Sequence, residues 1–280
     1  MEKIAIITDS SCDLPQEWIE KYNIEVLPLR VIYSKKEFRD RVEISPQEVY
    51  ESLEIETPKT SLPSPEDAKN LFQKLQDEEY THVLGIFISS GLSGTYNMVK
   101  NVANEFKKLT IELMDSKTLS MGLGFLVLEA AKEAYKNSNF EQIIEKTKKI
   151  LHKSDLFYVL KTLEYLRKGG RIGLVEGTVG EILGIKPIIS IDEEGKYYTY
   201  KKVRGRKKSI EDIYSIVKEK IKNKRIDIAI MHGDAEEEAK KLLERIKEIG
   251  NINEILFSQI SPVLGVHTGP GLIGVVTFEI

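Results

Sequence analysis

The chain has 280 residues, of which 41% are hydrophobic and 30% are charged, and its formal net charge is −3. That length allows one large domain or two, and the balanced charge gives no electrostatic basis for nucleic-acid binding. The N-terminus has only a short apolar run, which argues against a signal sequence, and no apolar segment approaches the length of a membrane span. The single cysteine, Cys12, excludes an intrachain disulfide, so we expect a cytoplasmic location.

Residues 1–152 alternate predicted strands and helices. Short apolar runs rich in β-branched residues predict buried strands at residues 3–8, 25–33, 83–88 and 110–114. Pro28 lies inside the second run and favours an edge strand or a bend there. Ser45 before Pro46 and Ser64 before Pro65 predict two helix starts. Helical periodicity predicts further helices from residue 96, at 121–135 and at 140–152.

Residues 153–280 continue the alternation. Strands are predicted at 155–160, 226–231, 254–258 and 272–278, a hairpin at 186–191 and 196–201, and helices at 162–168, 209–222 and 235–249. The Gly/Pro-rich residues 262–271, which include His267, are predicted to form a loop. The whole pattern predicts an α/β protein with two packed α/β domains, 1–152 and 153–280, each with a largely parallel sheet. A ligand cleft is expected between such domains.

Residues 83–104 contain the strongest candidate binding motif. A buried strand is followed by the small polar turn Ser89-Ser90-Gly91-Leu92-Ser93-Gly94-Thr95 and then by a helix. The first N–H groups of that helix lack intrahelical partners, and the helix dipole favours an anion there. Ser93 and Thr95 add hydroxyl donors. The anion is a phosphate or a carboxylate, and simple helix capping is the alternative role of this turn.

Other polar residues lie where ligands bind in α/β proteins, at strand ends and on stiff loops. Asp9 follows the first strand, and we favour a structural role for it, as an acceptor for neighbouring loop N–H groups. Thr60 and Ser61 lie on a proline-stiffened loop, which suits ligand contact and an ordinary turn equally well. The four histidines are far apart without metal-ligand spacing, so no metal and no cofactor are expected.

Several motifs occur together in one order along the whole chain. They are Thr8-Asp9-Ser10-Ser11-Cys12-Asp13-Leu14, Thr60-Ser61-Leu62-Pro63-Ser64, the turn at 89–95, Gly169-Gly170-Arg171 and Gly265-Val266-His267-Thr268-Gly269-Pro270-Gly271. Together they resemble the DegV family, the fatty-acid-binding carrier subunits of bacterial fatty acid kinase. No single motif is specific, but their joint order is.

The resemblance implies a non-catalytic carrier that binds one long-chain fatty acid, such as palmitate, between its domains. A partner kinase would then phosphorylate the carboxylate to an acyl phosphate, which feeds phospholipid synthesis. The family pattern places the carboxylate at Ser93 and Gly94, at Thr60 and Ser61, and at His267. Residues expected near the same site are Thr95, Arg171, Thr268 and Gly269. The resemblance also implies a ligand in the C14–C18 range. Separately, we expect transient contact with a membrane surface.

Residues 201–208 are mostly basic. A charge run of this kind is usually a solvated surface, and the alternative is a docking patch for an acidic partner or anionic phospholipid. Our hypothesis is that Arg204 and Arg206 help to dock the kinase.

Three other functions are alternatives to a lipid carrier. A serine hydrolase would use Ser93 as nucleophile and His267 as base, but the turn lacks the second glycine of the nucleophile elbow and no acid is nominated to orient the histidine. A phosphate-binding enzyme would need one of the glycine-rich phosphate motifs, which the sequence lacks. DNA binding is disfavoured by the net negative charge.

Overall fold

The computed structural model describes residues 2–178, 184–222 and 224–280. The chain divides into two compact units, one made of residues 1–30 and 61–152 and the other of residues 31–60 and 153–280. The sequence predicted two continuous domains that meet between residues 152 and 153, and one unit boundary lies there. The difference is that residues 31–60 belong with the second unit.

The reason for this assignment is the packing of α2 (Pro46–Ser52) against α10 (Pro262–Thr268). Tyr50 on α2 is buried, and a Cβ at Gly265 on α10 would lie 3.1 Å from its hydroxyl. The two helices therefore approach closely because Gly265 has no side chain. Hydrophobic periodicity identifies α2 in the sequence, but it does not identify the helix on which α2 packs.

The first unit has a four-stranded parallel sheet, in the order β2-β1-β6-β7. Its strands are β1 (Ile4–Asp9), β2 (Glu25–Leu27), β6 (His82–Phe87) and β7 (Thr110–Asp115). The short β2 is at the edge and ends before Pro28, as the proline predicted. The predicted parallel sheet is therefore confirmed for this unit.

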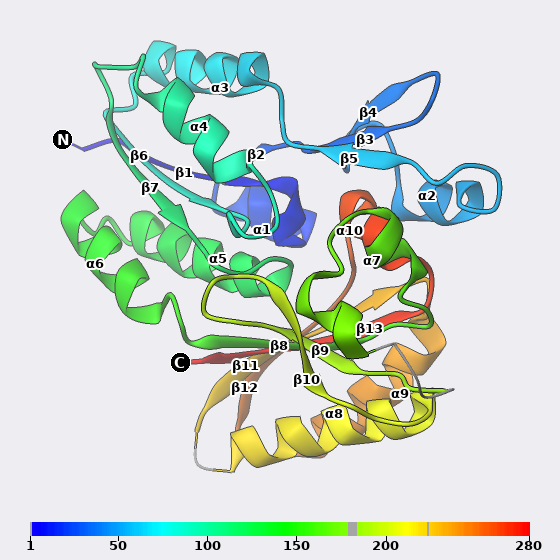
Figure 1. Ribbon diagram of the computed structural model, residues 1–280. Coiled ribbons are helices and arrows are strands. Elements are labelled where there is room, and N and C mark those ends of the chain that lie inside the picture. Colours follow the sequence, from blue (N-terminus) through cyan, green and yellow to red (C-terminus); the bar gives the residue numbers. More distant parts are fainter. Residues whose placement is uncertain (1, 179–183, 223) are drawn as a thin grey trace. The chain divides into compact units, whose positions relative to one another are not determined.

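Helices cover both faces of the parallel sheet (Figure 1). Helices α3 (Pro65–Asp77) and α4 (Thr95–Ala103) bury Phe72, Leu75 and Val99 in one core with β1 and β6. On the other face, α5 (Met121–Tyr135) contacts β1 and β6 and packs against α6 (Phe140–Ile150). A short 3₁₀ helix, η1 (Ser10–Cys12), and α1 (Gln16–Lys21) follow β1.

Two helices begin where the sequence predicted. Ser45 before α2 and Ser64 before α3 each accept a hydrogen bond from the third helical N–H, and an acidic side chain bonds back to the serine N–H. These are capping boxes with proline at the first helical position, so both starts are encoded locally.

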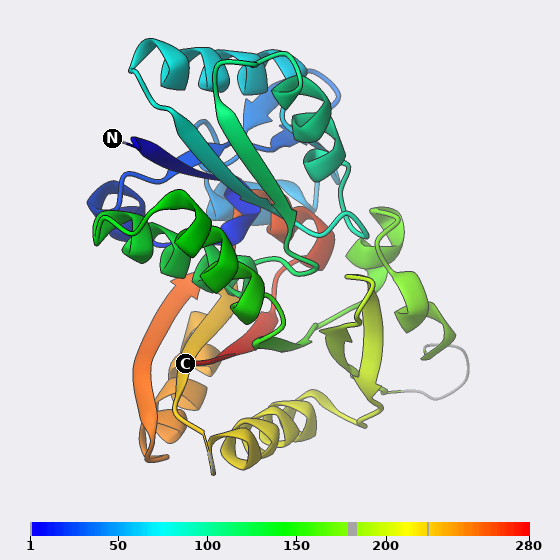
Figure 2. The ribbon, with the colours of Figure 1, turned by 90° about the vertical axis from the view of Figure 1, so that its left-hand side faces the viewer.

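The second unit has a six-stranded sheet in the order β10-β9-β8-β13-β11-β12 (Figures 1 and 2). Its strands are β8 (Ser154–Val159), β9 (Ile188–Ile191), β10 (Tyr197–Lys201), β11 (Ile226–Gly233), β12 (Ile252–Gln259) and β13 (Leu272–Glu279). Among the strands of this sheet in the described residues, β11 and β12 are parallel and the other neighbouring pairs are antiparallel. The prediction of a largely parallel sheet was therefore wrong for this unit, although its α/β class is confirmed. The cause is β13, the last strand, which inserts between β8 and β11 and runs antiparallel to both.

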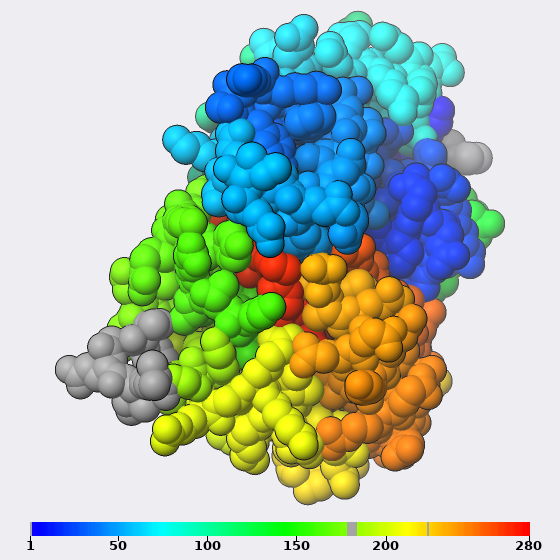
Figure 3. Space-filling model, turned by 90° about the vertical axis from the view of Figure 1, so that its right-hand side faces the viewer, coloured from blue at the N-terminus to red at the C-terminus, as the bar shows by residue number. Residues whose placement is uncertain are grey.

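One face of this sheet is covered by α8 (Arg206–Ile221) and α9 (Glu236–Lys247), which bury Ile213, Val217 and Leu242 against β8, β11 and β13. Figure 3 shows α8 and α9 in yellow and orange at the surface. Most of their charged side chains are exposed or half-buried, whereas Asp212 on α8 is buried. The predicted hairpin is formed by β9 and β10, and Asp192 in its turn accepts from the N–H groups of Glu194 and Lys196 at 3.0 and 2.9 Å.

The remaining elements of this unit are short. They are β3 (Arg30–Ile32), β4 (Glu37–Arg39) and β5 (Lys59–Ser61), which form a small sheet in the order β4-β3-β5, with α7 (Glu164–Lys168) and the 3₁₀ helix η2 (Gly173–Thr178). Residues 262–268, predicted as a loop, form the helix α10. Pro262 occupies its first turn and Gly269, with φ +64°, ends it, so the proline and glycine delimit a short helix here.

Asp9 has the structural role that the sequence favoured, and it is fully buried. Its Oδ1 accepts from the N–H and hydroxyl of Ser11 at 3.0 and 2.5 Å, and its Oδ2 accepts from the N–H of Ile88 at 2.8 Å. Burial raises the pKa of Asp9 to about 6, although these hydrogen bonds oppose the rise. The carboxylate ties the end of β1 to the end of β6.

We predict that Asp9→Asn destabilises the first unit by about 1–3 kcal/mol, because the amide NH₂ would face one of three N–H or O–H donors. Since the folded pKa exceeds the unfolded one, Asp9 favours folding below pH 4, and that contribution is lost as pH rises through about 6. The difference in unfolding free energy between wild type and variant should therefore shrink from pH 4 to pH 7 in urea titrations. The exposed Asp77→Asn is the control and should cost no more than about 0.5 kcal/mol. A difference that grows with pH would contradict this.

Candidate functional site

Hydrogen bonds to Ser89 fix the first residues of the turn between β6 and α4. The last residues of the turn are not bonded to Ser89. The carbonyl oxygen of Ser89 accepts from the N–H groups of Leu92 and Ser93, both at 3.0 Å, and its hydroxyl oxygen accepts from Gly91 N at 3.0 Å. Ser89 is fully buried, whereas Ser93 is half-buried and Gly94 is exposed. The predicted strand, turn and helix are therefore all present, with the turn fixed at its first residue.

The end of the turn presents several hydrogen-bond donors. The hydroxyl oxygens of Ser93 and Thr95 lie 2.8 Å apart, and Thr95 N–H donates to Ser93 Oγ at 3.3 Å. Gly94 is the N-cap of α4 and provides no side-chain cap. Among the described residues, no acceptor is present for the N–H groups of Gly94, Tyr96 and Asn97. Free N–H groups, hydroxyls and a helix N-terminus together favour an anion at this point.

In the second unit, Thr60 on β5 meets His267 on α10. Thr60 Oγ1 lies 2.7 Å from His267 Nε2, and both side chains are half-buried. The other ring nitrogen, Nδ1, is buried and has no partner in the part of the chain that the structure describes. Burial, together with the positive charge of Arg171, lowers the pKa of His267 to about 4. The ring is therefore neutral at pH 7, with one nitrogen already bonded to a threonine.

The motif Gly169-Gly170-Arg171 fits around this histidine. A Cβ at Gly169 would lie 2.1 Å from His267 Nδ1, so the ring occupies the space of the missing side chain. Arg171 Nη1 donates to the Gly169 carbonyl at 2.8 Å. Gly169 has a φ of −78°, and the left-handed φ of +67° belongs to Gly170. Gly169 is required for the space it leaves.

The other expected residues near the site have structural partners. A Cβ at Gly269 would lie 2.1 Å from Tyr165 Cδ2, and Thr268 donates its hydroxyl to the Leu264 carbonyl at 3.0 Å. Ser61 is half-buried, and its hydroxyl has no hydrogen-bond partner among the residues described. The closing motif therefore shapes α10 as well as carrying His267.

The hydrolase alternative gains no support from these contacts. Ser93 Oγ pairs with Thr95, and His267 Nε2 pairs with Thr60, so each would have to exchange its partner to form a catalytic dyad. Within residues 2–178, 184–222 and 224–280, no cluster of metal-ligating side chains is found and no helix is long and apolar enough to cross a bilayer.

The basic residues at 201–208 differ in how they are used. Arg206 is half-buried and forms a bidentate ion pair with Glu238, at 2.8 to 3.1 Å. Lys201 and Lys208 both pair with Asp212 at 2.7 Å. Arg204 is exposed, and no ion pair to it is found among the described residues. Of the two arginines proposed for docking, Arg204 is the one available to a partner.

A family model described as "Uncharacterised protein, DegV family" matches residues 3–279. This chain belongs to the DegV family. A DegV domain-containing protein of Clostridium acetobutylicum is 50% identical over 279 residues, which cover 100% of both proteins.

Two solved structures that are similar to this chain are of proteins described as binding fatty acids. A DegV family protein from Thermus thermophilus, described by its fatty acid binding, has a TM-score of 0.92 at 30% identity, covering 99% of this chain and 100% of its own. A stearic acid-binding protein from Eubacterium ventriosum has a TM-score of 0.90 at 26% identity, covering 100% and 98%. The resemblance inferred from the motifs is therefore confirmed at the level of the family and fold.

The packing at Gly169 predicts a measurable change in His267. In Gly169→Ala, the backbone can accept the methyl group, but the ring must shift, and we expect it to move toward solvent. The pKa of His267 should then rise from about 4 toward its usual value of 6.5, because desolvation is its main cause. NMR titration of the imidazole protons would measure this.

The matched control is Gly177→Ala in the same unit, where a Cβ would meet nothing within 4 Å. It should leave the His267 pKa at about 4. Wild type should also lose stability as pH falls from about 6.5 toward 4, since the unfolded chain binds the proton first. An unchanged His267 titration in Gly169→Ala would show that the ring does not depend on that space.

Proposed function

We propose that this DegV protein binds one long-chain fatty acid and presents its carboxylate to a partner kinase, without catalysing a reaction itself. The observation that carries the proposal is the Ser89–Thr95 turn, whose free N–H groups and hydroxyls match a carboxylate. Two structural relatives of high coverage are described as fatty acid binding and stearic acid-binding. The ligand is therefore a fatty acid, and no cofactor is part of the proposal.

The carboxylate interacts with Ser93 and Gly94 at the turn, next to Thr95, whose side chain is buried. A carboxylate moved out of water costs several kcal/mol unless its oxygens are paired. The Ser93 hydroxyl and the unpartnered N–H groups at the start of α4 supply charge-assisted hydrogen bonds. Their role is to select a carboxylate and to fix its orientation.

Thr60, Ser61 and His267 are the second part of the proposed head-group site. With the proton of the neutral ring on Nε2, His267 donates to Thr60 Oγ1, and the Thr60 hydroxyl proton is left for the carboxylate. Ser61 adds a hydroxyl that has no hydrogen-bond partner among the described residues. Arg171, which lowers the pKa of His267, adds positive charge near the ring, and Thr268 and Gly269 hold that ring's helix.

The acyl chain supplies most of the binding free energy. Burial of each CH₂ contributes about 0.8 kcal/mol, so a long chain gains on the order of 10 kcal/mol from water. Much of this gain cancels when the donor is a membrane, because the chain is already out of water there. Discrimination among lipids therefore falls to the head-group residues.

We extend the proposal to the kinase step on the basis of exposed charge. Arg204 lies in a basic stretch and is free to meet an acidic surface, whereas Arg206 is held by Glu238. The kinase would transfer the terminal phosphoryl group of ATP to an oxygen of the bound carboxylate, releasing ADP and forming an acyl phosphate for phospholipid synthesis. A transient encounter with anionic membrane would use the same kind of charge.

Lipid extraction and native mass spectrometry of the purified protein test the ligand. We expect one co-purified C14–C18 fatty acid per chain. Ser93→Ala should weaken palmitate binding by roughly tenfold to a hundredfold, the cost of one charge-assisted hydrogen bond. The exposed Ser215→Ala on α8 is the control and should leave the dissociation constant unchanged. Absence of bound lipid together with no palmitate affinity would refute the carrier function.

Charge reversal at Arg204 tests the docking surface. Arg204→Glu should slow acyl phosphate formation with a bacterial fatty acid kinase about threefold to tenfold, because a rim charge acts mainly on association. The affinity for palmitate should not change. Lys218→Glu, a charge reversal at another exposed residue, on α8, is the control. Equal rates for wild type and Arg204→Glu would remove Arg204 from the interface.

A further inference from the structure

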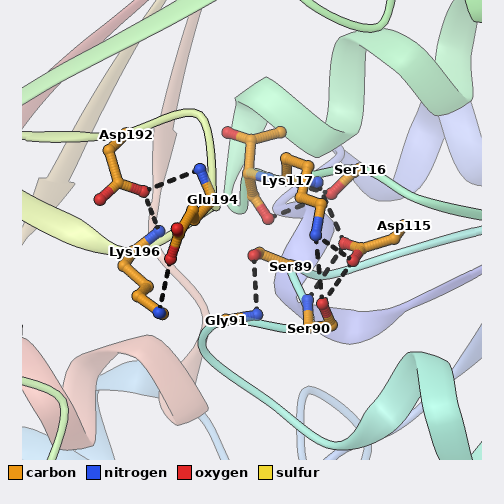
Figure 4. A network of polar contacts seen from close by, with 10 residues as sticks. Ser89, Ser90, Gly91, Asp115, Ser116, Lys117, Asp192, Glu194 and Lys196 are labelled. Carbon is orange, nitrogen blue, oxygen red and sulfur yellow. Dashed lines mark hydrogen bonds and ion pairs between the residues drawn. The ribbon is translucent and has the colours of Figure 1, made fainter.

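Asp115, the last residue of β7, accepts hydrogen bonds from Ser90 in the neighbouring turn and from Lys117 in its own loop. Its Oδ1 accepts from the N–H groups of Ser90 and Lys117 at 3.0 and 3.2 Å. Its Oδ2 accepts from the Ser90 hydroxyl at 2.5 Å and from Lys117 Nζ at 2.9 Å. Figure 4 shows the Ser90 and Lys117 side chains pointing at this carboxylate. Only 14% of the Asp115 side chain is exposed.

These contacts hold the first half of the Ser89–Thr95 turn. Asp115 accepts hydrogen bonds from both the N–H and the hydroxyl of Ser90. Thr118, three residues after Asp115, accepts from the N–H of Ser89 at 2.9 Å through its carbonyl oxygen. Ser89 in turn bonds Gly91, Leu92 and Ser93. The loop after β7 therefore fixes Ser89 and Ser90, and these fix the residues up to Ser93.

We propose that Asp115 is a positioning residue for carboxylate binding. This proposal rests on the fatty acid function proposed above. Asp115 acts through Ser90 and touches no ligand atom. With Ser90 held, the Ser93 hydroxyl and the free N–H groups at the start of α4 keep one fixed arrangement. Without that anchor the donors sample several arrangements, and ordering them costs part of the binding free energy.

Electrostatics alone predicts the opposite effect. Asp115 is a negative charge beside a site for an anion, and Lys117 offsets it at 2.9 Å. Burial would raise the pKa of Asp115, but its hydrogen bonds with Ser90 and Lys117 lower it below the usual value, so it is ionised at pH 7. If charge were its only influence, Asp115→Asn would strengthen carboxylate binding. If position matters more, the same variant weakens it.

The experiment compares palmitate with hexadecanol, which has the same chain and no charge, in wild type and Asp115→Asn. We expect palmitate binding to weaken about tenfold and hexadecanol binding to change less than twofold. Glu133→Gln is the matched control. Glu133 lies in the same unit, is also 14% exposed, and binds Lys136, Lys146 and Ser138 away from the turn. It should leave both affinities unchanged.

Equal or tighter palmitate binding in Asp115→Asn would overturn the proposal, and so would equal weakening of both ligands. Amide hydrogen exchange at Leu92 and Ser93 without ligand gives a separate readout and should be faster in the variant. If wild type binds neither lipid while exchange is faster, the fatty acid function fails although the turn is anchored as described. If Asp115→Asn does not fold, Ser90→Ala removes one bond of the same pair, and palmitate binding should weaken about threefold.

Discussion

The structure around the candidate site depends on three successive peptide N–H groups at the end of β6. Those of Ile88, Ser89 and Ser90 donate to Asp9, to the Thr118 carbonyl and to Asp115, at 2.8, 2.9 and 3.0 Å. Asp9 ends β1, whereas Asp115 ends β7 and Thr118 follows it, so the acceptors come from the ends of the two strands that flank β6. Buried N–H groups must be paired, so these bonds allow the chain to leave the sheet and form a turn of small residues. The donors beyond Ser93 then remain available for an anion.

In the second unit, glycines make room for the side chains at the candidate site. His267 is neutral because it is desolvated. Its ring is hydrogen-bonded to Thr60 on one side and occupies the space left by the missing side chain of Gly169 on the other. Tyr165 fills the space at Gly269 in the same way. A glycine-rich motif can thus be a packing surface for aromatic rings, and the positive φ values at Gly269 and Gly170 are only part of its role.

A lipid carrier needs recognition groups that are fixed in advance and that do no chemistry. Hydroxyls and peptide N–H groups meet that need, since they donate hydrogen bonds at pH 7 without changing charge. A carboxylate bound by such groups keeps its own charge and remains a nucleophile for a partner enzyme. The same donors would be poor catalysts of ester hydrolysis, because a hydrolase needs a base that takes a proton from its serine.

The sequence by itself determined the features that depend on neighbouring residues. The capping boxes at Ser45 and Ser64, the edge position of β2 before Pro28, the strand, turn and helix at residues 83–104 and the hairpin of β9 and β10 all follow from local chemistry. The ordered motifs also identified the DegV family. Asp115 directly follows the strand predicted at 110–114, and its position in the sequence gives no reason to connect it with Ser90.

Only the tertiary structure decided which segments meet. It placed β13 between β8 and β11, so that most of that sheet is antiparallel, and it joined residues 31–60 to the second unit through Tyr50 and Gly265. It turned the expected loop before Gly269 into α10 and set the ring of His267 over Gly169. Some of these outcomes depend on contacts between residues more than a hundred positions apart in the sequence. Hydrophobic periodicity describes only which face a segment buries. The identity of the partner surface is settled by packing, which no local pattern contains.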